Sequence, residues 1–246
     1  MQEPREPLKA AIALLLSFSA GVVDVVGFLA VYQTFTAHMT GATVHLGMDL
    51  MQQNWWQAMI AGGVIASFLL GSIVGRAIIE IGARKQFLRV ASLTLALEGA
   101  LLLLCVLIGN GRPGVVFLLL SMLATSMGLQ TATLTRIGAL TVHTTFVTGM
   151  LNKFAQLVSR ALFESYDMSR GANSSLQQQR RLTVRQAAFI FSIWCLYLAG
   201  AVIGTLLTNT WAIGALSVPV ALLGIAIVAD FYEPLSVEEE KDQSER

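Results

Sequence analysis

The chain has 246 residues, of which 55% are hydrophobic and only 13% are charged, and its mean hydropathy is +0.67. Soluble domains carry about twice this fraction of charged residues, so the composition indicates an integral membrane protein. The net charge of +1 gives no indication of a nucleic-acid partner. The two cysteines, Cys105 and Cys195, lie in apolar runs, which favours buried thiols over a disulfide framework or a zinc site.

The first half of the chain, residues 10–110, begins with an apolar run that predicts a membrane span over 10–33. Residues 1–9 lead straight into this apolar run, and no A-x-A cleavage pattern follows it, so we expect a retained span and a short cytoplasmic N-terminus. This span carries one carboxylate, Asp24. The next segment, 35–52, is too rich in Thr, His and Gly for an ordinary span, which is typical of a segment that lines a pathway or pocket.

Two further spans complete the first half. An uncharged run from 57 to 75, which fades by about residue 81, predicts the second span. A run over 90–109 predicts the third and carries Glu98 near its centre. The breaker cluster at 110–114 then marks the boundary between the halves.

The second half, residues 111–231, opens with an uncharged span over 115–135 that ends before Arg136. A second Thr-rich segment covers 140–163. It is followed by a polar segment, 164–185, with four arginines, which we expect to form a cytoplasmic loop.

The end of the chain contains an apolar run and an acidic tail. Residues 186–229 carry no charge, and the run is too long for one span, so we predict two helices joined by a tight turn. The tail, 232–246, is predicted to be a short, disordered cytoplasmic segment. The expected fold class is therefore an all-α integral membrane protein.

The two halves contain the same motifs in the same order, which predicts an internal repeat. Equivalent positions are Ala20–Gly21 and Met127–Gly128, Thr40–Gly41 and Thr148–Gly149, and the glycine pairs Gly71/Gly75 and Gly200/Gly204. The first two motifs recur at almost the same offset along the chain, and one insertion at the polar segment 164–185 accounts for the larger offset of the glycine pairs. The alternative explanation is that glycine and threonine are common in packed membrane helices.

The basic residues predict how the chain crosses the membrane, because Lys and Arg gather in cytoplasmic loops. Basic regions are the N-terminus, the connection between the second and third spans, Arg136 and the segment 164–185. They all lie on one side only if the segments 35–52 and 140–163 do not cross completely. We therefore predict about six transmembrane helices and two Thr/Gly-rich partial or re-entrant segments, with both termini in the cytoplasm. Each half then has an odd number of spans, so the repeats are inverted, as in many transporters and channels.

Two carboxylates within the predicted spans, Asp24 and Glu98, are costly in lipid and are expected to face the interior of the bundle. Each is interpreted either as an ion or proton site or as a hydrogen bond that fixes the packing of two helices. Arg136 is the nearest candidate counter-ion, although a cytoplasmic charge that sets the topology is the favoured explanation for it.

His38, His45 and Asp49 are spaced to lie on one face of a helix. Such a face can bind a transition metal. Hydrogen bonding to neighbouring helices is the favoured interpretation, because the second half keeps only one histidine, His143. We therefore expect no metal or other cofactor.

Four stretches, AGVVDVVGFL, FTAHMTGATVHLG, GLQTATLTRIGAL and HTTFVTGML, resemble the YoaK-type family of bacterial inner-membrane proteins, which is named as a domain of unknown function. The resemblance extends from about residue 12 to residue 230. Ala42 and Thr131 stand where the family usually has asparagine. The matching positions are Asp24, Thr40, Gly41, Gln130, Arg136, Thr145, Thr148 and Gly149. The resemblance implies a multi-pass protein of the bacterial cytoplasmic membrane, without an activity.

The pattern of polar residues favours a small-solute or ion transporter or channel, with Asp24 as the candidate for coupling to protons or ions. The expected pathway residues are Asp24, Thr40, Gly41, Glu98, Gln130, Arg136, Thr145, Thr148 and Gly149. Expected partners are membrane lipid, the solute or ion, and a second copy of the chain bound through the glycine faces, with no nucleic acid.

Two other classes of function are alternatives. In a non-transporting regulatory or scaffold subunit, the same glycine and threonine motifs would serve packing only. An intramembrane enzyme is disfavoured, because the chain contains neither a GxSxG nor an HExxH motif.

Overall fold

The computed structural model describes residues 6–85, 87, 89–109, 113–133, 136–137, 140–170 and 174–232. The α-helices within these residues are α1 (Glu6–Val26), α2 (Met39–Met51), α3 (Trp55–Arg84), α4 (Val90–Ile108), α5 (Val116–Thr133), α6 (Val147–Arg170), α7 (Ser174–Trp211) and α8 (Ser217–Tyr232). Shorter elements are the π-helical turn η1 (Gly27–Tyr32), the 3₁₀ turns η2 (Pro113–Val115) and η3 (Ala212–Leu216), and an antiparallel ribbon of β1 (Arg136–Ile137) and β2 (Leu140–Thr141). The prediction of a disordered acidic tail concerns residues outside the described part of the chain.

Five stretches of the described chain are long and apolar enough to cross a membrane. They are α1 with η1, then α3, α4, α5, and a stretch of 58 residues, Ser175–Tyr232. The turn η3 divides the last stretch into two helices, as predicted for residues 186–229. Large apolar side chains cover the outer faces of these helices, and Leu69 and Leu206 are 56% and 63% exposed. Such surfaces need lipid around them. The chain is therefore a multi-pass helical membrane protein, which confirms the prediction from composition.

Two helix crossings, α1 against α7 and α3 against α5, form the centre of the bundle. At each crossing a glycine from each of the two helices allows the two backbones to approach closely. A Cβ atom at any of four glycines would collide with a carbonyl oxygen of the facing helix: Gly21 with Tyr197, Gly200 with Phe18, Gly71 with Thr125 and Gly128 with Phe68.

Helices α4 and α8 pack against each other and cover the two central pairs, α4 against α5 and α8 against α1. At one end of this contact the Ser92 hydroxyl donates a hydrogen bond to the buried Asp230 carboxylate. Near it, the Arg89 guanidinium lies 4.2 Å from the centre of the Phe231 ring. Buried side chains of α1, α4, α5, α7 and α8 share one apolar core.

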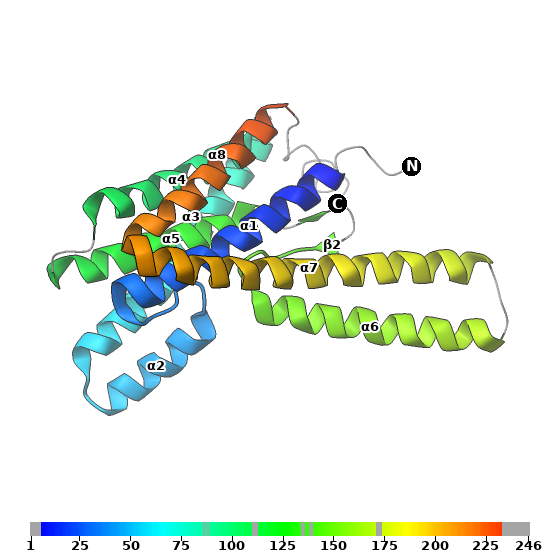
Figure 1. Cartoon of the computed structure of the whole chain (residues 1–246), viewed down its shortest axis with the longest axis horizontal. Coiled ribbons are helices and arrows are strands. Elements are labelled where there is room, and N and C mark those ends of the chain that lie inside the picture. Colours follow the sequence, from blue (N-terminus) through cyan, green and yellow to red (C-terminus); the bar gives the residue numbers. More distant parts are fainter. Residues whose placement is uncertain are drawn as a thin grey trace.

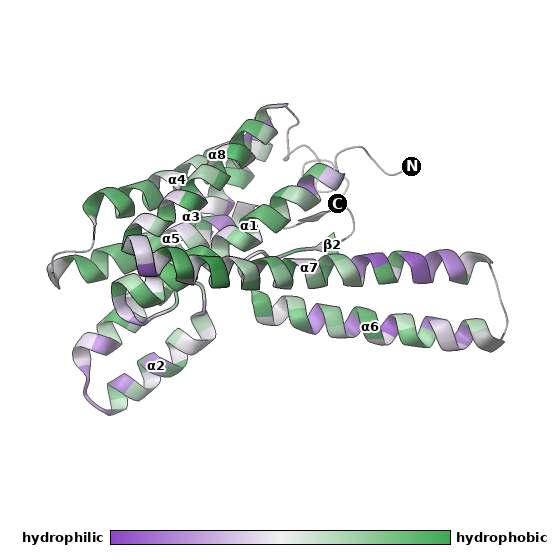
Figure 2. Cartoon of the chain, in the orientation of Figure 1, coloured by the Kyte–Doolittle hydropathy of each residue, from purple (hydrophilic) through white to green (hydrophobic). Residues whose placement is uncertain are grey.

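The two hairpins formed by α2 with α3 and by α6 with α7 project from opposite ends of the molecule (Figure 1). In the same view, the start of α1 and the end of α8 both lie toward the α6–α7 end. Figure 2 shows that hydrophilic residues gather on the outer part of the α6–α7 hairpin, away from the green helices of the bundle.

The polar segment 164–185, which we expected to form a loop, is largely helical. α6 continues to Arg170 and α7 begins at Ser174, so the two helices form a long hairpin. One reason is that Leu, Gln and Arg, the main residues of 176–182, are good helix formers. A second reason is that apolar side chains of α6 pack along α7, where the rings of Phe154 and Phe191 lie 5.1 Å apart.

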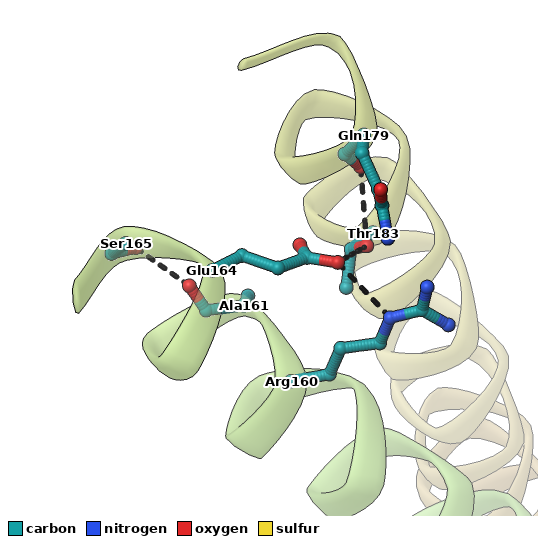
Figure 3. Close-up of polar contacts among 6 residues, drawn as sticks. All are labelled: Arg160, Ala161, Glu164, Ser165, Gln179 and Thr183. Atoms are coloured by element: carbon teal, nitrogen blue, oxygen red, sulfur yellow. Dashed lines mark hydrogen bonds and ion pairs between the residues drawn. The ribbon is translucent and has the colours of Figure 1, made fainter. Parts of the chain in front are cut away.

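Polar side chains also hold this hairpin together (Figure 3). Glu164 is only 7% exposed, and its Oε1 accepts hydrogen bonds from Arg160 Nε at 3.0 Å and from the Thr183 hydroxyl at 3.2 Å. One turn away, Arg180 Nε donates to the Ser165 hydroxyl at 2.8 Å. The contacts between Glu164, Thr183, Ser165 and Arg180 cross from one helix to the other, so the hairpin is a defined element and not a flexible loop.

Candidate functional site

The site begins where α1 loses its regular hydrogen bonding. The helix widens into the turn η1, and residues 33–38 are not helical before α2 begins. Non-helical backbone within a membrane needs partners for its amide groups. Asp24 provides them, because its Oδ1 accepts hydrogen bonds from the backbone N–H of Thr36 at 2.8 Å and of Ala37 at 2.9 Å. The Thr36 hydroxyl donates to the same oxygen at 2.8 Å.

The second oxygen of Asp24 contacts α7. The Tyr197 hydroxyl donates a hydrogen bond to Asp24 Oδ2. Asp24 is only 4% exposed, so its carboxylate is buried, and the groups that donate hydrogen bonds to it are neutral. The contact agrees with the interpretation that Asp24 forms a hydrogen bond that fixes the packing of two helices. Its role as an ion site stays a prediction.

The second half contains a similar non-helical segment, between α5 and α6. At the end of α5 the hydroxyls of Thr131 and Thr145 lie 2.6 Å apart and share a hydrogen bond. Gln130 Nε2 donates to the Leu16 carbonyl at 2.8 Å and to the Thr144 hydroxyl at 3.1 Å. These contacts attach the segment before α6 to α5 and α1, as Asp24 attaches the segment before α2 to α1.

A cavity of about 570 Å³ is lined by both non-helical segments and by the helices beside them. The lining residues of the first half are Asp24, Phe35, Ala37, His38, Met39, Thr40 and Phe68, and those of the second half are Thr131, His143, Thr145, Phe146, Val147, Thr148 and Tyr197. We call this space the central cavity. Its walls are mostly apolar and aromatic, and among the described residues they include Asp24 as the one carboxylate and neither Lys nor Arg.

Two aromatic pairs stand at the starts of α2 and α6. The rings of Phe35 and His38 lie 5.9 Å apart at 75°, and those of His143 and Phe146 lie 6.4 Å apart at 74°. His38 and Phe146 each pack against the first turn of the following helix, which explains the glycine of each Thr-Gly motif. A Cβ at Gly41 would lie 2.7 Å from His38 Nδ1, and a Cβ at the equivalent glycine of α6 would collide with the Phe146 ring.

A second cavity of about 690 Å³ lies beside the first, between η1, α2 and α3. Phe35 and His38 line both cavities, so this aromatic pair forms the wall between them. We call this second space the vestibule. His45 and Asp49, the proposed metal-binding face with His38, line it too, but the described residues contain no group of three or more His, Cys, Asp or Glu side chains that could hold a metal ion.

The structure brings together some of the residues that the sequence singled out. Asp24, Thr40, Thr145 and Thr148 line the central cavity, and Gly41 lines the vestibule. Gly149 lies beneath the Phe146 ring.

The other three predicted residues lie elsewhere. Gln130 is fully buried and acts between helices. Glu98 is fully buried in α4, does not line the central cavity, and neither of its carboxylate oxygens has a hydrogen-bond partner among the described residues. Arg136 lies in β1, and its side chain is outside the described part of the structure.

Sequence reasoning missed Tyr197, Phe68 and Phe146, which provide much of the aromatic wall. The internal repeat contained the signal for two of them, since Tyr197 follows Phe68 at the same offset at which Gly200 follows Gly71.

The glycine faces proposed for a homodimer are used within the chain. Gly71 and Gly75 pack against α5, and Gly200 and Gly204 pack against α1. A homodimer stays a prediction, and it would have to form through a different face.

Comparison with known proteins agrees with this architecture. The family described as "Protein of unknown function (DUF1275)" matches residues 12–229. The chain is 28% identical over 219 residues to a protein of Bacillus subtilis (strain 168) named "UPF0700 transmembrane protein YoaK", covering 87% of this chain and 91% of that protein. No solved structure gives a significant match.

Proposed function

The chain belongs to the DUF1275 family of proteins, and we propose that it is a transporter of the bacterial cytoplasmic membrane for a small solute or ion. The proposal includes an architecture of six spans, namely α1, α3, α4, α5, α7 and α8, with α2 and α6 as half-helices that enter and leave on the same side. The two halves are inverted repeats that meet at the central cavity.

The lining of the central cavity is the observation that carries the proposal. Each of its lining residues in the first half has an equivalent in the second half at the offsets of the sequence repeat. Asp24 corresponds to Thr131, the segment from Phe35 to Thr40 corresponds to the segment 143–148, and Phe68 corresponds to Tyr197. Chance matches of common residues do not predict that both sets line one cavity.

The helix crossings support the same equivalence. The contact of Gly21 with Tyr197 in one crossing corresponds to the contact of Gly128 with Phe68 in the other, again at the offsets of the sequence repeat. The hairpins of α2 with α3 and α6 with α7 project from opposite ends (Figure 1), which supports opposite orientations of the halves in the membrane. Inverted repeats with broken helices at the midplane are a common architecture of secondary transporters.

The two adjoining cavities suggest a route for the solute. The vestibule extends from the aromatic pair Phe35 and His38 toward Asp49 and Gln57, which flank the turn between α2 and α3. The aromatic pair then separates the vestibule from the central cavity. The equivalent pair in the second half, His143 and Phe146, would separate the central cavity from the opposite side of the membrane.

A screen of the purified protein for stabilising solutes tests the proposal, with Asp24→Asn beside the wild type. Asparagine keeps Oδ1 as an acceptor and removes the charge. A transporter site predicts that the variant stays folded and loses the response to a solute that raises the unfolding temperature of the wild type. A variant that is only less stable, with no solute response in either protein, would favour the non-transporting regulatory or scaffold subunit.

A further inference from the structure

We infer that the central cavity binds an organic cation, a substituted ammonium ion with an apolar body, an inference that rests on the proposed function and specifies its substrate class. The cavity combines one buried carboxylate with four aromatic rings.

The charge of the cavity points to a cation. Asp24 Oδ1 accepts from two backbone amides and one hydroxyl, and Oδ2 accepts from the Tyr197 hydroxyl. These neutral donors orient the carboxylate but do not neutralise it. Each carboxylate oxygen offers about two lone-pair positions, and Oδ2 accepts one hydrogen bond, so Oδ2 has room for one more partner. Among the described residues no Lys or Arg lines the cavity, so a cation that enters would bring a full positive charge to a wall that has none.

The aromatic rings point to an organic cation rather than a metal ion or a proton. Phe35, Phe68, Phe146 and Tyr197 all line the cavity. The faces of Phe and Tyr rings attract ammonium groups, and several rings around one site are a known means of recognising alkylated ammonium ions. A metal ion would instead need several ligating side chains, and the described residues contain no such group.

The size of the cavity agrees with this assignment. At about 570 Å³ it lies within the usual range for sites of small organic ligands and is far larger than a proton or a bare inorganic ion requires. Anions are disfavoured by the single carboxylate. Neutral sugars are disfavoured because most of the lining surface of the cavity is apolar.

The position of Asp24 in the repeat makes the charge of the cavity asymmetric. The equivalent position in the second half is Thr131, so only one of these two equivalent positions carries a charge. The aromatic residues do not show this asymmetry, because Phe68 and Tyr197 occupy equivalent positions and both side chains carry a ring. The cavity therefore has one place for the ammonium group, beside Asp24 and Tyr197, and apolar walls for its substituents.

Thermal unfolding of the purified full-length protein in lipid nanodiscs tests the inference with four probes: tetraethylammonium, choline, the uncharged choline isostere 3,3-dimethylbutanol, and benzoate. At a concentration about ten times the dissociation constant, an organic cation should raise the unfolding midpoint by about 3–6 °C. Neither 3,3-dimethylbutanol nor benzoate should do so.

Two variants and a control locate the effect. Asp24→Asn should abolish the shift with tetraethylammonium. Phe68→Leu, which removes a ring but no hydrogen bond to Asp24, should weaken cation binding about tenfold and still decides the question if Asp24→Asn does not fold. Phe117→Leu is the matched control, because Phe117 packs near Gly63 outside the central cavity, and it should keep the response of the wild type.

The outcomes separate failure of this inference from failure of the proposed function. Stabilisation by 3,3-dimethylbutanol or benzoate equal to that by choline would overturn the assignment of an organic cation but would keep a solute site. If neither cation raises the unfolding midpoint, the assignment of an organic cation is also overturned. If, in addition, Thr131→Cys reacts with a membrane-impermeant thiol reagent from one side of the membrane only, or from neither, the transporter itself would be rejected.

Discussion

Tyr197 of α7 donates a hydrogen bond to Asp24 of α1, a residue far away from it in the sequence. The bond forms at the wall of the central cavity and beside the crossing where Gly21 meets the Tyr197 carbonyl. It joins the first half of the chain to the second near the end of α1, just before the π-helical turn η1. Packing of the two halves and the position of the charge are therefore set by the same contact.

Replacement of Tyr197 by phenylalanine removes this donor and keeps the ring. Because a hydrogen bond to a charged group contributes about 1.5–3 kcal/mol, we expect the free energy of unfolding to fall by about 2 kcal/mol. The change is measured by thermal unfolding, with the reaction of Cys105 and Cys195 with a thiol reagent as the signal of unfolding. Tyr232→Phe is the control, since Tyr232 is 87% exposed and should show no difference. Equal stability of Tyr197→Phe and wild type would mean that the contact with Asp24 is not made.

The close helix crossings predict a sharp contrast between two glycines. Gly128→Ala places a methyl group against the Phe68 carbonyl and should destabilise the protein by about 1–3 kcal/mol, because a tightly packed site cannot accept extra volume. Gly224→Ala is the matched change in α8, where nothing lies within 4 Å of an added Cβ. It should be neutral or slightly stabilising, because alanine favours helix. Similar unfolding midpoints for the two variants would contradict the crossing of α3 with α5.

Two glutamates in ion pairs should differ in their effect on stability. Glu164 is buried between α6 and α7, and its replacement by alanine should cost about 1–3 kcal/mol and expose the hairpin to proteolysis. Glu80 pairs with Arg84 at 3.1 Å on an exposed helix surface, so Glu80→Ala should change stability by less than about 1 kcal/mol. Limited proteolysis at the tip of the hairpin, compared between the two variants, provides the measurement. Equal resistance would contradict the buried contact of Glu164 with Thr183.

Much of the fold follows from apolar runs and their breaks. The apolar segments predicted over 57–81, 90–109 and 115–135 agree within a few residues with α3, α4 and α5. The polar segment 164–185 was wrongly predicted as a loop, because its polar residues report exposure to water and not the backbone conformation. Packing against α6 decides the conformation, and this contact cannot be recognised from polarity alone.

The candidate site was only partly predictable for a related reason. A carboxylate in an apolar run, such as Asp24, and the Thr-Gly pairs are local signals that can be recognised in one segment. Tyr197 is an ordinary aromatic residue within its own helix, and it gains its meaning only from the crossing that brings it to Asp24. Glu98 shows the converse, since its local signal equals that of Asp24 but the structure buries it away from the central cavity.

The arrangement of the spans predicts which connections share a side of the membrane. Gln53, between α2 and α3, and Lys85, at the end of α3, should lie on opposite sides, with Lys85 in the cytoplasm. Single cysteines at these positions, in a chain with Cys105 and Cys195 replaced by alanine, can be labelled with a membrane-impermeant reagent in right-side-out and inside-out vesicles. If both positions react from the same side, α3 does not span the membrane and the inverted repeat is excluded.

Access to the central cavity from both sides of the membrane is the most direct test of transport. Thr131 lines the cavity and is the equivalent of Asp24 in the second half of the repeat. Thr131→Cys in the same cysteine-free chain introduces a small reactive group there. A transporter that exposes the cavity alternately predicts labelling by the impermeant reagent in both vesicle orientations. Leu69→Cys, near the middle of α3 and 56% exposed on the apolar surface, should react in neither. Labelling of Thr131→Cys from both sides is the result that the proposed function predicts, and labelling from one side only, or from none, would contradict it.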